Sequence, residues 1–180
     1  MSTNIGDKTA IAGVGQTKLG THPGRSHFSL VAEAAKLAIE DAGLKREEVD
    51  GVLTLSPNSE PVYTHHTYLA EWLGINERFG TTMSNGGATC SAMVMVAAMA
   101  VEAGLCNAVV CAFADNPNSG RGRRTGGAQS EGQFGPEFGF FAPASIHALA
   151  ARRHMHEYGT TQEQLGAIAV QFRQHASRNP

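Results

Sequence analysis

The sequence predicts an α/β protein built around a parallel β-sheet. Short apolar runs alternate with stretches of helical periodicity along most of the chain, and this alternation is typical of strands joined by right-handed helical crossovers. The run at residues 108–113 is apolar on both faces, as expected for a strand in the middle of a parallel sheet. The chain has 180 residues, of which 42% are hydrophobic, and this is enough for one domain with a core.

The apolar runs and the capping residues place each element in order. Strands are expected at residues 9–14, 52–55, 81–84 and 108–113. Helices are expected at residues 30–42, 64–73, within 84–104, and at 143–157 and 161–176. Ser29 and Thr161 are the expected N-caps of the first and last helices, and Gly43 is expected to end the first helix. The buried face of the first helix is expected to carry Leu30, Ala34, Leu37 and Ala38.

The rest of the chain is organised around residues 84–104. A polar turn with paired glycines leads there into a helix made almost wholly of Ala, Val and Met. A helix that is apolar all round is expected to be buried. The first N–H groups of a helix lack internal partners and carry a partial positive charge. We therefore expect the turn to hold a nucleophile, an oxyanion or a thioester.

Charge, hydropathy and cysteine usage exclude several classes of function. A formal net charge of −2 offers no basic surface for nucleic acid, and no apolar run approaches the roughly 20 residues of a membrane span. Three cysteines without a CxxC pair fit a reducing compartment, so a cytoplasmic protein is expected. His65 and His66 are adjacent and lack partners at metal-ligand spacing, so no metal is expected. Lys18 stands where a GxGxxG motif needs its third glycine, which argues against a dinucleotide site.

Two segments carry a resemblance to a known family. Residues 87–92, Gly-Ala-Thr-Cys-Ser-Ala, resemble the active-site helix of thiolases, especially the sterol-carrier-protein thiolase branch. Residues 152–180 contain His-Met, Tyr-Gly-Thr, His-Ala and Asn-Pro in the order that is typical of that branch and its lipid-transfer-protein relatives. With residues 11–15 and 38–43, the resemblance extends over essentially the whole chain.

The resemblance implies a thiolase-like fold, of which this chain holds the N-terminal βαβαβαβ half and part of a helical loop region. The α/β core is expected over residues 1–117 and the start of the loop region over residues 118–180. The fifth strand and the C-terminal half of the family are absent from this sequence. The resemblance also implies lipid metabolism, a homodimer, and an acyl-CoA substrate with no further cofactor.

Cys90 and Gly87 are alternative occupants of the reactive position. Thiolases use a thiolate to take the acyl group, and Cys90 lies near a helix N-terminus, which lowers the pKa of a thiol. When Ala88 and Thr89 are aligned with the family's Ala-Thr pair without a gap, however, the nucleophile position falls on Gly87. Cys90 is then three residues further along, a displacement of about 4.5 Å, where it would be a buried small side chain.

The two alignments imply different reactions. The first is acyltransferase-type cleavage or formation of a C–C bond next to a thioester on a bulky or steroid-like acyl chain. The second follows from Gly87, which resembles the cysteine-independent retro-aldolases that cleave a β-hydroxyacyl-CoA and work with a small OB-like acyl-CoA-binding partner. Because the family's second half is absent, a non-catalytic acyl-CoA or lipid-binding subunit also remains open, and so does the question of whether this chain is itself an enzyme.

Substrate-binding residues are expected at the turn and in the glycine-rich segment after the last strand. Asn85, Gly86 and Gly87 would hold the thioester end of the substrate. The three arginines of the Arg-Gly-Arg-Arg segment would bind the phosphates of coenzyme A, or else belong to a solvated loop; they are Arg121, Arg123 and Arg124.

Overall fold

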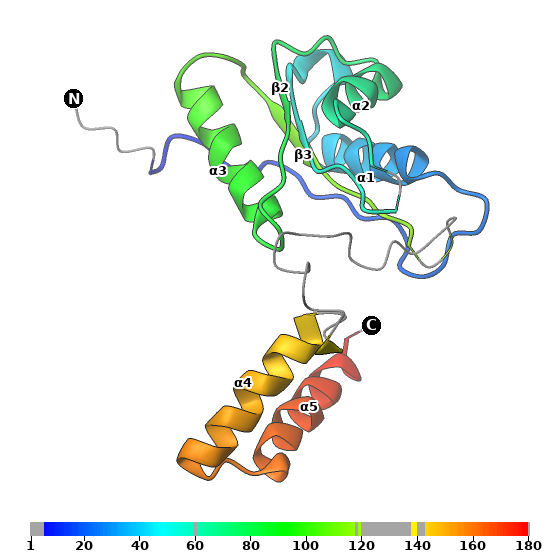
Figure 1. The fold of residues 1–180 in the computed structure, drawn as a ribbon. Helices are drawn as coiled ribbons and strands as arrows, with labels where there is room; N and C mark the ends of the chain where they lie inside the picture. Colours follow the sequence, from blue (N-terminus) through cyan, green and yellow to red (C-terminus); the bar gives the residue numbers. More distant parts are fainter. Residues whose placement is uncertain (1–5, 60, 118, 120–137, 140–142, 180) are drawn as a thin grey trace. The chain divides into compact units, whose positions relative to one another are not determined.

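The computed structural model describes residues 6–59, 61–117, 119, 138–139 and 143–179. The chain divides into two compact units, Met1–Arg123 and Arg124–Pro180. In the first unit, three strands form a parallel sheet in the order β2-β1-β3 (Figure 1). They are β1 (Gly51–Thr54), β2 (Phe79–Thr82) and β3 (Val109–Ala112). Gly51 pairs with Phe79 on one side and with Val109 on the other, so the parallel α/β prediction is confirmed.

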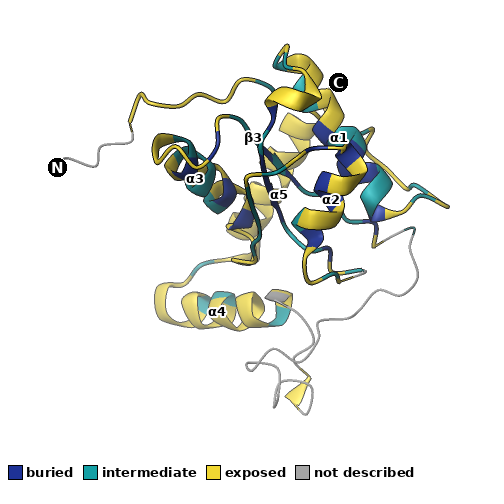
Figure 2. Cartoon of the chain, turned by 90° about the horizontal axis from the view of Figure 1, so that it is seen from above, coloured by how far each residue is buried: buried dark blue, intermediate teal, exposed yellow. Residues whose placement is uncertain are grey.

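Helices cover both faces of this sheet (Figure 1). Helices α1 (His27–Asp41) and α2 (His65–Leu73) pack on one face, and α3 (Thr89–Glu102) packs on the other. A short 3-10 helix, η1 (Arg46–Glu48), precedes β1. The core lies between the sheet and the first two helices, where the darkest residues of Figure 2 gather. It is built from Val31, Ala35, Val49, Val52, Leu69, Leu73, Ile75, Val110 and Ala112, among others.

Asp50 ties together the amino ends of the strands. Its carboxylate accepts hydrogen bonds from the backbone N–H of Asn107 (2.7 Å), from the side chain of Asn107 (2.9 Å) and from the N–H of Ala108 (3.0 Å). Arg78 approaches the same carboxylate at 3.5 Å. Burial raises the pKa of Asp50, but these N–H groups and the guanidinium outweigh burial and hold it below its usual value.

The expected buried strand at residues 9–14 is wrong. The structure assigns no strand there, and Ile11 and Val14 are 73% and 72% exposed. Gly13 instead lies against the backbone of α1. A Cβ at that position would come within 2.3 Å of the Ala38 carbonyl oxygen, so only a glycine fits there. The N–H of Val14 donates to the Asp41 carboxylate (2.9 Å) and is therefore not available to a neighbouring strand.

Helix α1 begins three residues before the expected position. Ser26, not Ser29, is the N-cap, since the Ser26 hydroxyl accepts the N–H of Ser29 (3.2 Å). The buried face is also rotated from the expected one: Leu30 is buried as expected, but Leu37 is 38% exposed. Gly43 follows the helix at φ +68°, which confirms it as the residue that ends α1.

Helix α3 is not buried as its composition predicts. Only Thr89, Met93 and Ala100 are buried. Val94, Met95 and Met99 are 43%, 56% and 50% exposed. Within the first unit, α3 packs against β1 and β3 of the sheet.

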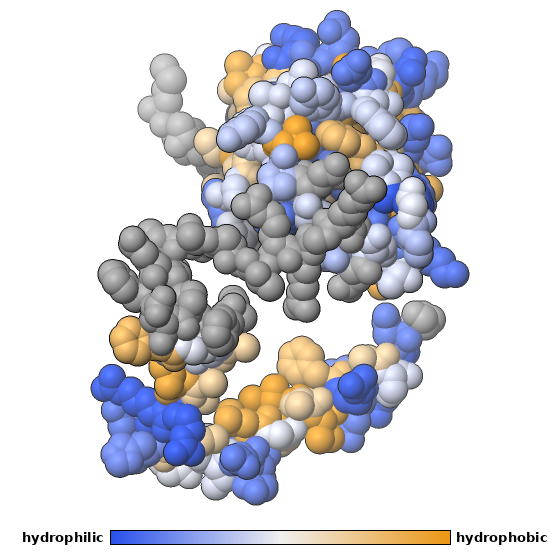
Figure 3. Space-filling view, turned by 45° about the vertical axis from the view of Figure 1, so that its right-hand side comes forward, coloured by the Kyte–Doolittle hydropathy of each residue, from blue (hydrophilic) through white to orange (hydrophobic). Residues whose placement is uncertain are grey.

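The second unit contains helices α4 (Pro143–Tyr158) and α5 (Gln162–Ala176), close to the expected bounds. Thr161 caps α5 as predicted, and Gln164 completes a capping box with it. None of the described residues of these helices is buried, and a band of apolar side chains lies along them (Figure 3), including Ile146, Leu149, Leu165, Ile168 and Phe172. Among the described residues, no helix is long and apolar enough to cross a membrane.

Candidate functional site

The carboxyl ends of the three parallel strands meet at one edge of the sheet, which is where open α/β sheets bind ligands. Asp115, three residues after β3, joins two of the loops at this edge. Its carboxylate accepts the N–H of Asn58 (2.9 Å) and the hydroxyl of Ser59, both from the loop after β1. The loops after β1 and β3 are therefore held together beside the turn that leads from β2 to α3.

That turn is the one the sequence singles out. Met83, the residue before the turn, donates its N–H to the carbonyl of Thr54 at the end of β1 (2.8 Å). The N–H of Ala88 then donates to the carbonyl of Asn85 (3.3 Å), and Gly86 adopts a positive φ of +57°. Only glycine takes this conformation without steric cost. The glycine pair thus lets the chain reverse directly into α3.

The turn leaves backbone donors without acceptors. Within the described residues, the N–H groups of Gly86 and Gly87 have no hydrogen-bond partner. Ala88 is the N-cap of α3, and its side chain caps no backbone N–H. No atom would lie within 4 Å of a Cβ added at Gly87. An accessible helix N-terminus with free N–H groups can bind a developing negative charge on oxygen.

Cys90 lies in the first turn of α3 and is exposed. The alignment that puts Gly87 at the reactive position carries the expectation that Cys90 is a buried small side chain, and this expectation is wrong. The other two cysteines lie deeper. Burial raises the pKa of the Cys106 thiol, and burial together with the nearby Cys90 raises the pKa of Cys111 to about 11. Neither is a reactive thiolate near neutral pH.

The other expected site residues lie partly elsewhere. Asn85 and the glycine pair lie together at the head of α3, and all three are exposed. Arg121, Arg123 and Arg124 lie outside the described residues.

The adjacent histidines of α2 serve different partners. The Nδ1 atom of His65 lies 3.0 Å from the hydroxyl of Thr54, and the Nδ1 atom of His66 lies 2.9 Å from the hydroxyl of Thr82. Over the part of the chain that the structure describes, no group of three or more His, Cys, Asp or Glu side chains is placed to hold a metal ion.

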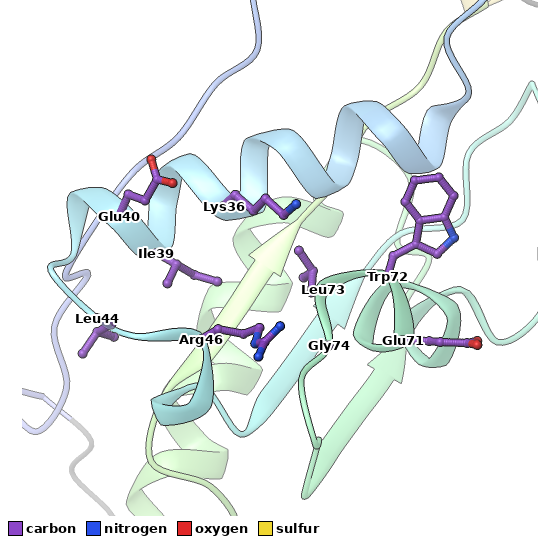
Figure 4. Close-up of a pocket in the computed structure, with 9 residues that line it drawn as sticks. All are labelled: Lys36, Ile39, Glu40, Leu44, Arg46, Glu71, Trp72, Leu73 and Gly74. Carbon is purple, nitrogen blue, oxygen red and sulfur yellow. The ribbon is translucent and has the colours of Figure 1, made fainter.

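A cavity of about 440 Å³ lies between the carboxyl-terminal ends of α1 and α2 (Figure 4). Lys36 and Arg46 extend into it above Leu73. Its charges cancel formally, because Glu40 and Glu71 also line it, and the Arg46 guanidinium is already paired with Glu47 (2.8 Å). The cavity also lies away from the turn, and we do not assign it to the site.

Sequence reasoning missed Thr89 and Asp115. Thr89 is buried in the first turn of α3, and its hydroxyl bonds back into the polar turn. A threonine at the start of an apolar helix is a signal for such a bond. Asp115 carries no comparable signal, because its partners are 56 and 57 residues away in the sequence.

The chain is similar in sequence and in fold to known proteins. No family model matches the chain. The chain is 38% identical over 181 residues to a steroid side-chain-cleaving aldolase of Thermomonospora curvata, covering 95% of this chain and 45% of the relative. It is 36% identical over 186 residues to a 17-hydroxy-3-oxo-4-pregnene-20-carboxyl-CoA lyase of Mycobacterium tuberculosis, covering 98% and 47%. The solved structure of an Ltp2-ChsH2(DUF35) aldolase matches with a TM-score of 0.81 and 39% identity, over 95% of this chain and 44% of that one.

An acetyl-CoA acetyltransferase of Methanothermobacter thermautotrophicus is 31% identical over 179 residues, covering 95% of this chain and 45% of the relative. The chain belongs to the thiolase superfamily. The chain spans about half the length of the curated relatives that it matches.

Proposed function

We propose that this thiolase-superfamily protein takes part in the retro-aldol cleavage of a β-hydroxyacyl-CoA with a steroid-like acyl chain. Two relatives named as an aldolase and a lyase are 38% and 36% identical to the chain, against 31% for the acetyltransferase. The observation that carries the proposal is Gly87. The residue at the reactive position of the turn has no side chain, although the space around it would admit one.

A retro-aldol reaction does not need a nucleophile at this position. A base takes the proton of the β-hydroxyl group, the bond between the α and β carbons breaks, and its electron pair moves onto the α carbon and the thioester carbonyl as an enolate. The β carbon becomes a ketone, and the α carbon takes a proton from an acid. No bond forms to the enzyme, so a glycine is compatible with the chemistry.

The turn would stabilise the enolate. Its negative charge develops on the thioester oxygen, and the free N–H groups of Gly86 and Gly87 at the positive end of α3 are donors for such an oxygen. In this proposal Asn85 lines the same site, and Arg121, Arg123 and Arg124 bind the coenzyme A phosphates. The acid and base come from the part of the fold that the relatives contain beyond the length matched here. The protein acts as a homodimer with a small OB-like acyl-CoA-binding partner.

The test uses the full-length protein, expressed with and without the OB-like partner. The substrate is 17-hydroxy-3-oxo-4-pregnene-20-carboxyl-CoA, the compound in the name of one relative. Cleavage between the ring and the side chain should release a 17-ketosteroid and propanoyl-CoA, both measured by mass spectrometry. The Cys90→Ser variant should cleave the substrate as fast as the unmodified protein does. Binding of the substrate without either product would refute the proposal and indicate a non-catalytic acyl-CoA-binding subunit.

Acyl transfer through Cys90 is the competing reaction. The observation that favours this reaction is the exposure of Cys90 at the head of α3. Incubation with acetyl-CoA followed by intact-mass measurement separates the two. A retro-aldolase should show no acetyl adduct. An adduct that the Cys90→Ser substitution abolishes would refute the retro-aldol proposal.

A further inference from the structure

Thr89 connects the turn to the helix through one hydroxyl group. Its side chain is buried, at 1% exposure. The Oγ1 atom accepts the backbone N–H of Asn85 (2.8 Å) and donates to the carbonyl of Gly86 (2.7 Å). One hydroxyl therefore engages two successive peptide groups of the turn, one as acceptor and the other as donor.

These two bonds maintain the conformation from which the free donors arise. The Gly86 carbonyl also accepts the N–H of Thr89 (3.2 Å), so it is held toward the helix by two donors from the same residue. Gly86 is at φ +57°, a conformation that a glycine leaves easily because it has no side chain to restrict it. Without the hydroxyl, the Asn85 N–H would lose its acceptor. The turn would then keep only two backbone bonds, from the Ala88 N–H to the Asn85 carbonyl and from the Thr89 N–H to the Gly86 carbonyl.

The side chain type also suits this task. A β-branched threonine has few rotamers, so its hydroxyl is held in place before any substrate arrives. Serine would keep the hydroxyl but gain rotamer freedom, and valine would keep the shape but lose both hydrogen bonds. The two substitutions therefore separate the hydroxyl from the methyl group.

We infer that Thr89 is a positioning residue, whose buried hydroxyl fixes the turn so that the Gly86 and Gly87 N–H groups are presented to the substrate oxygen. This inference rests on the proposed function for its catalytic consequence. The arrangement of the turn itself is independent of that function and is measured separately.

The first measurement is hydrogen exchange of the Asn85 amide by NMR in the full chain. Thr89→Val should speed this exchange by about tenfold or more, because the part-buried Asn85 N–H loses its hydrogen-bond acceptor. Thr89→Ser should restore slow exchange. Thr54→Val is the matched control, because Thr54 is also fully buried and hydrogen-bonded through its hydroxyl. It should leave the exchange of Asn85 unchanged.

The second measurement is steroid acyl-CoA cleavage by the full-length protein with its partner. Thr89→Val should lower kcat by about 10-fold to 100-fold, as expected for a weakened oxyanion site, with KM unchanged, and Thr89→Ser should recover most of kcat. Equal loss with Thr89→Ser, or an unchanged Asn85 exchange rate in Thr89→Val, would overturn the inference. If the unmodified protein cleaves nothing, the proposed function fails, and the exchange rates alone decide whether Thr89 positions the turn.

Discussion

A buried histidine makes the first unit sensitive to acid. His65 is fully buried where α2 meets the end of β1, and its Nδ1 atom lies 3.0 Å from the Thr54 hydroxyl. The ring stacks on Phe28 with a centroid separation of 4.8 Å, and the buried His27 ring lies 5.3 Å away. Among the described residues, the titratable groups that act on His65 are two other imidazoles, His27 from α1 and His66 from its own helix. Protonation would place a charge there without a carboxylate to balance it.

The magnitude follows from the pKa. Burial, with the neighbouring His27 and His66, lowers the pKa of His65 from 6.5 to about 4. Between these values the unfolded chain binds a proton and the folded chain does not. The stabilising contribution of the neutral ring is therefore fully present above the unfolded value and is lost as the pH falls toward the folded one. A difference of this size corresponds to about 3 kcal/mol of unfolding free energy at 1.36 kcal/mol per pH unit.

Urea unfolding of the full chain at several pH values between about 7 and 4 measures this loss. The fluorescence of Trp72, the single tryptophan, reports on the same helix, α2. His65→Asn keeps a polar atom near the Nδ1 position and removes the titration, so it should flatten the pH dependence. His147→Asn, on the exposed surface of α4, should leave it unchanged. If the slope is absent in the unmodified chain, or persists in His65→Asn, the reasoning is refuted.

Three further predictions concern stability. Asp50→Asn should lower the unfolding free energy by about 1–3 kcal/mol, because the N–H groups that bond to Asp50 lose a charged acceptor. Since the pKa of Asp50 is lowered in the folded chain, this difference in stability should vanish as the pH falls below 3.8. An equal loss at all pH values would contradict this. Gly13→Ala should cost about 1–3 kcal/mol through its clash with α1, whereas Gly166→Ala, in open space within α5, should increase helix content by circular dichroism; the opposite order would show that Gly13 is not closely packed. Gly86→Ala should lower the unfolding free energy, measured by urea unfolding, by about 1–2 kcal/mol because Gly86 has a positive φ. The unfolding free energy of Gly87→Ala should lie within about 0.5 kcal/mol of that of the unmodified chain. Equal effects of the two substitutions would contradict the turn geometry.

Much of the fold could be predicted because the signals that specify it are local. The cap at Thr161 and the stop at Gly43 each depend on a few neighbouring residues, and both are confirmed. The apolar run at residues 108–113 identified β3 as a strand, but its expected place in the middle of the sheet is wrong. In the order β2-β1-β3 it lies at an edge of the described sheet, and buried residues alternate with partly buried ones along it. The turn at residues 84–88 was also identified from its glycines and from the helix that follows it.

The candidate site could be predicted only in part. The sequence identified Asn85, Gly86 and Gly87 as neighbours at a helix N-terminus, because they are adjacent in the chain. It did not identify the Thr89 hydroxyl as the group that holds them, since a threonine hydroxyl has several possible local partners and only the packed helix selects among them.

The sequence by itself determined the order of the elements, the position of the turn and the family resemblance, because each of these depends on residues close together in the chain. Only the tertiary structure decided that residues 9–14 lie against α1 rather than in the sheet, that α3 exposes Met95 and Met99, and that His65 is buried beside His27. These features depend on contacts between distant segments. Composition indicates that an apolar or small residue will be covered, but the covering partner is settled only when the elements pack.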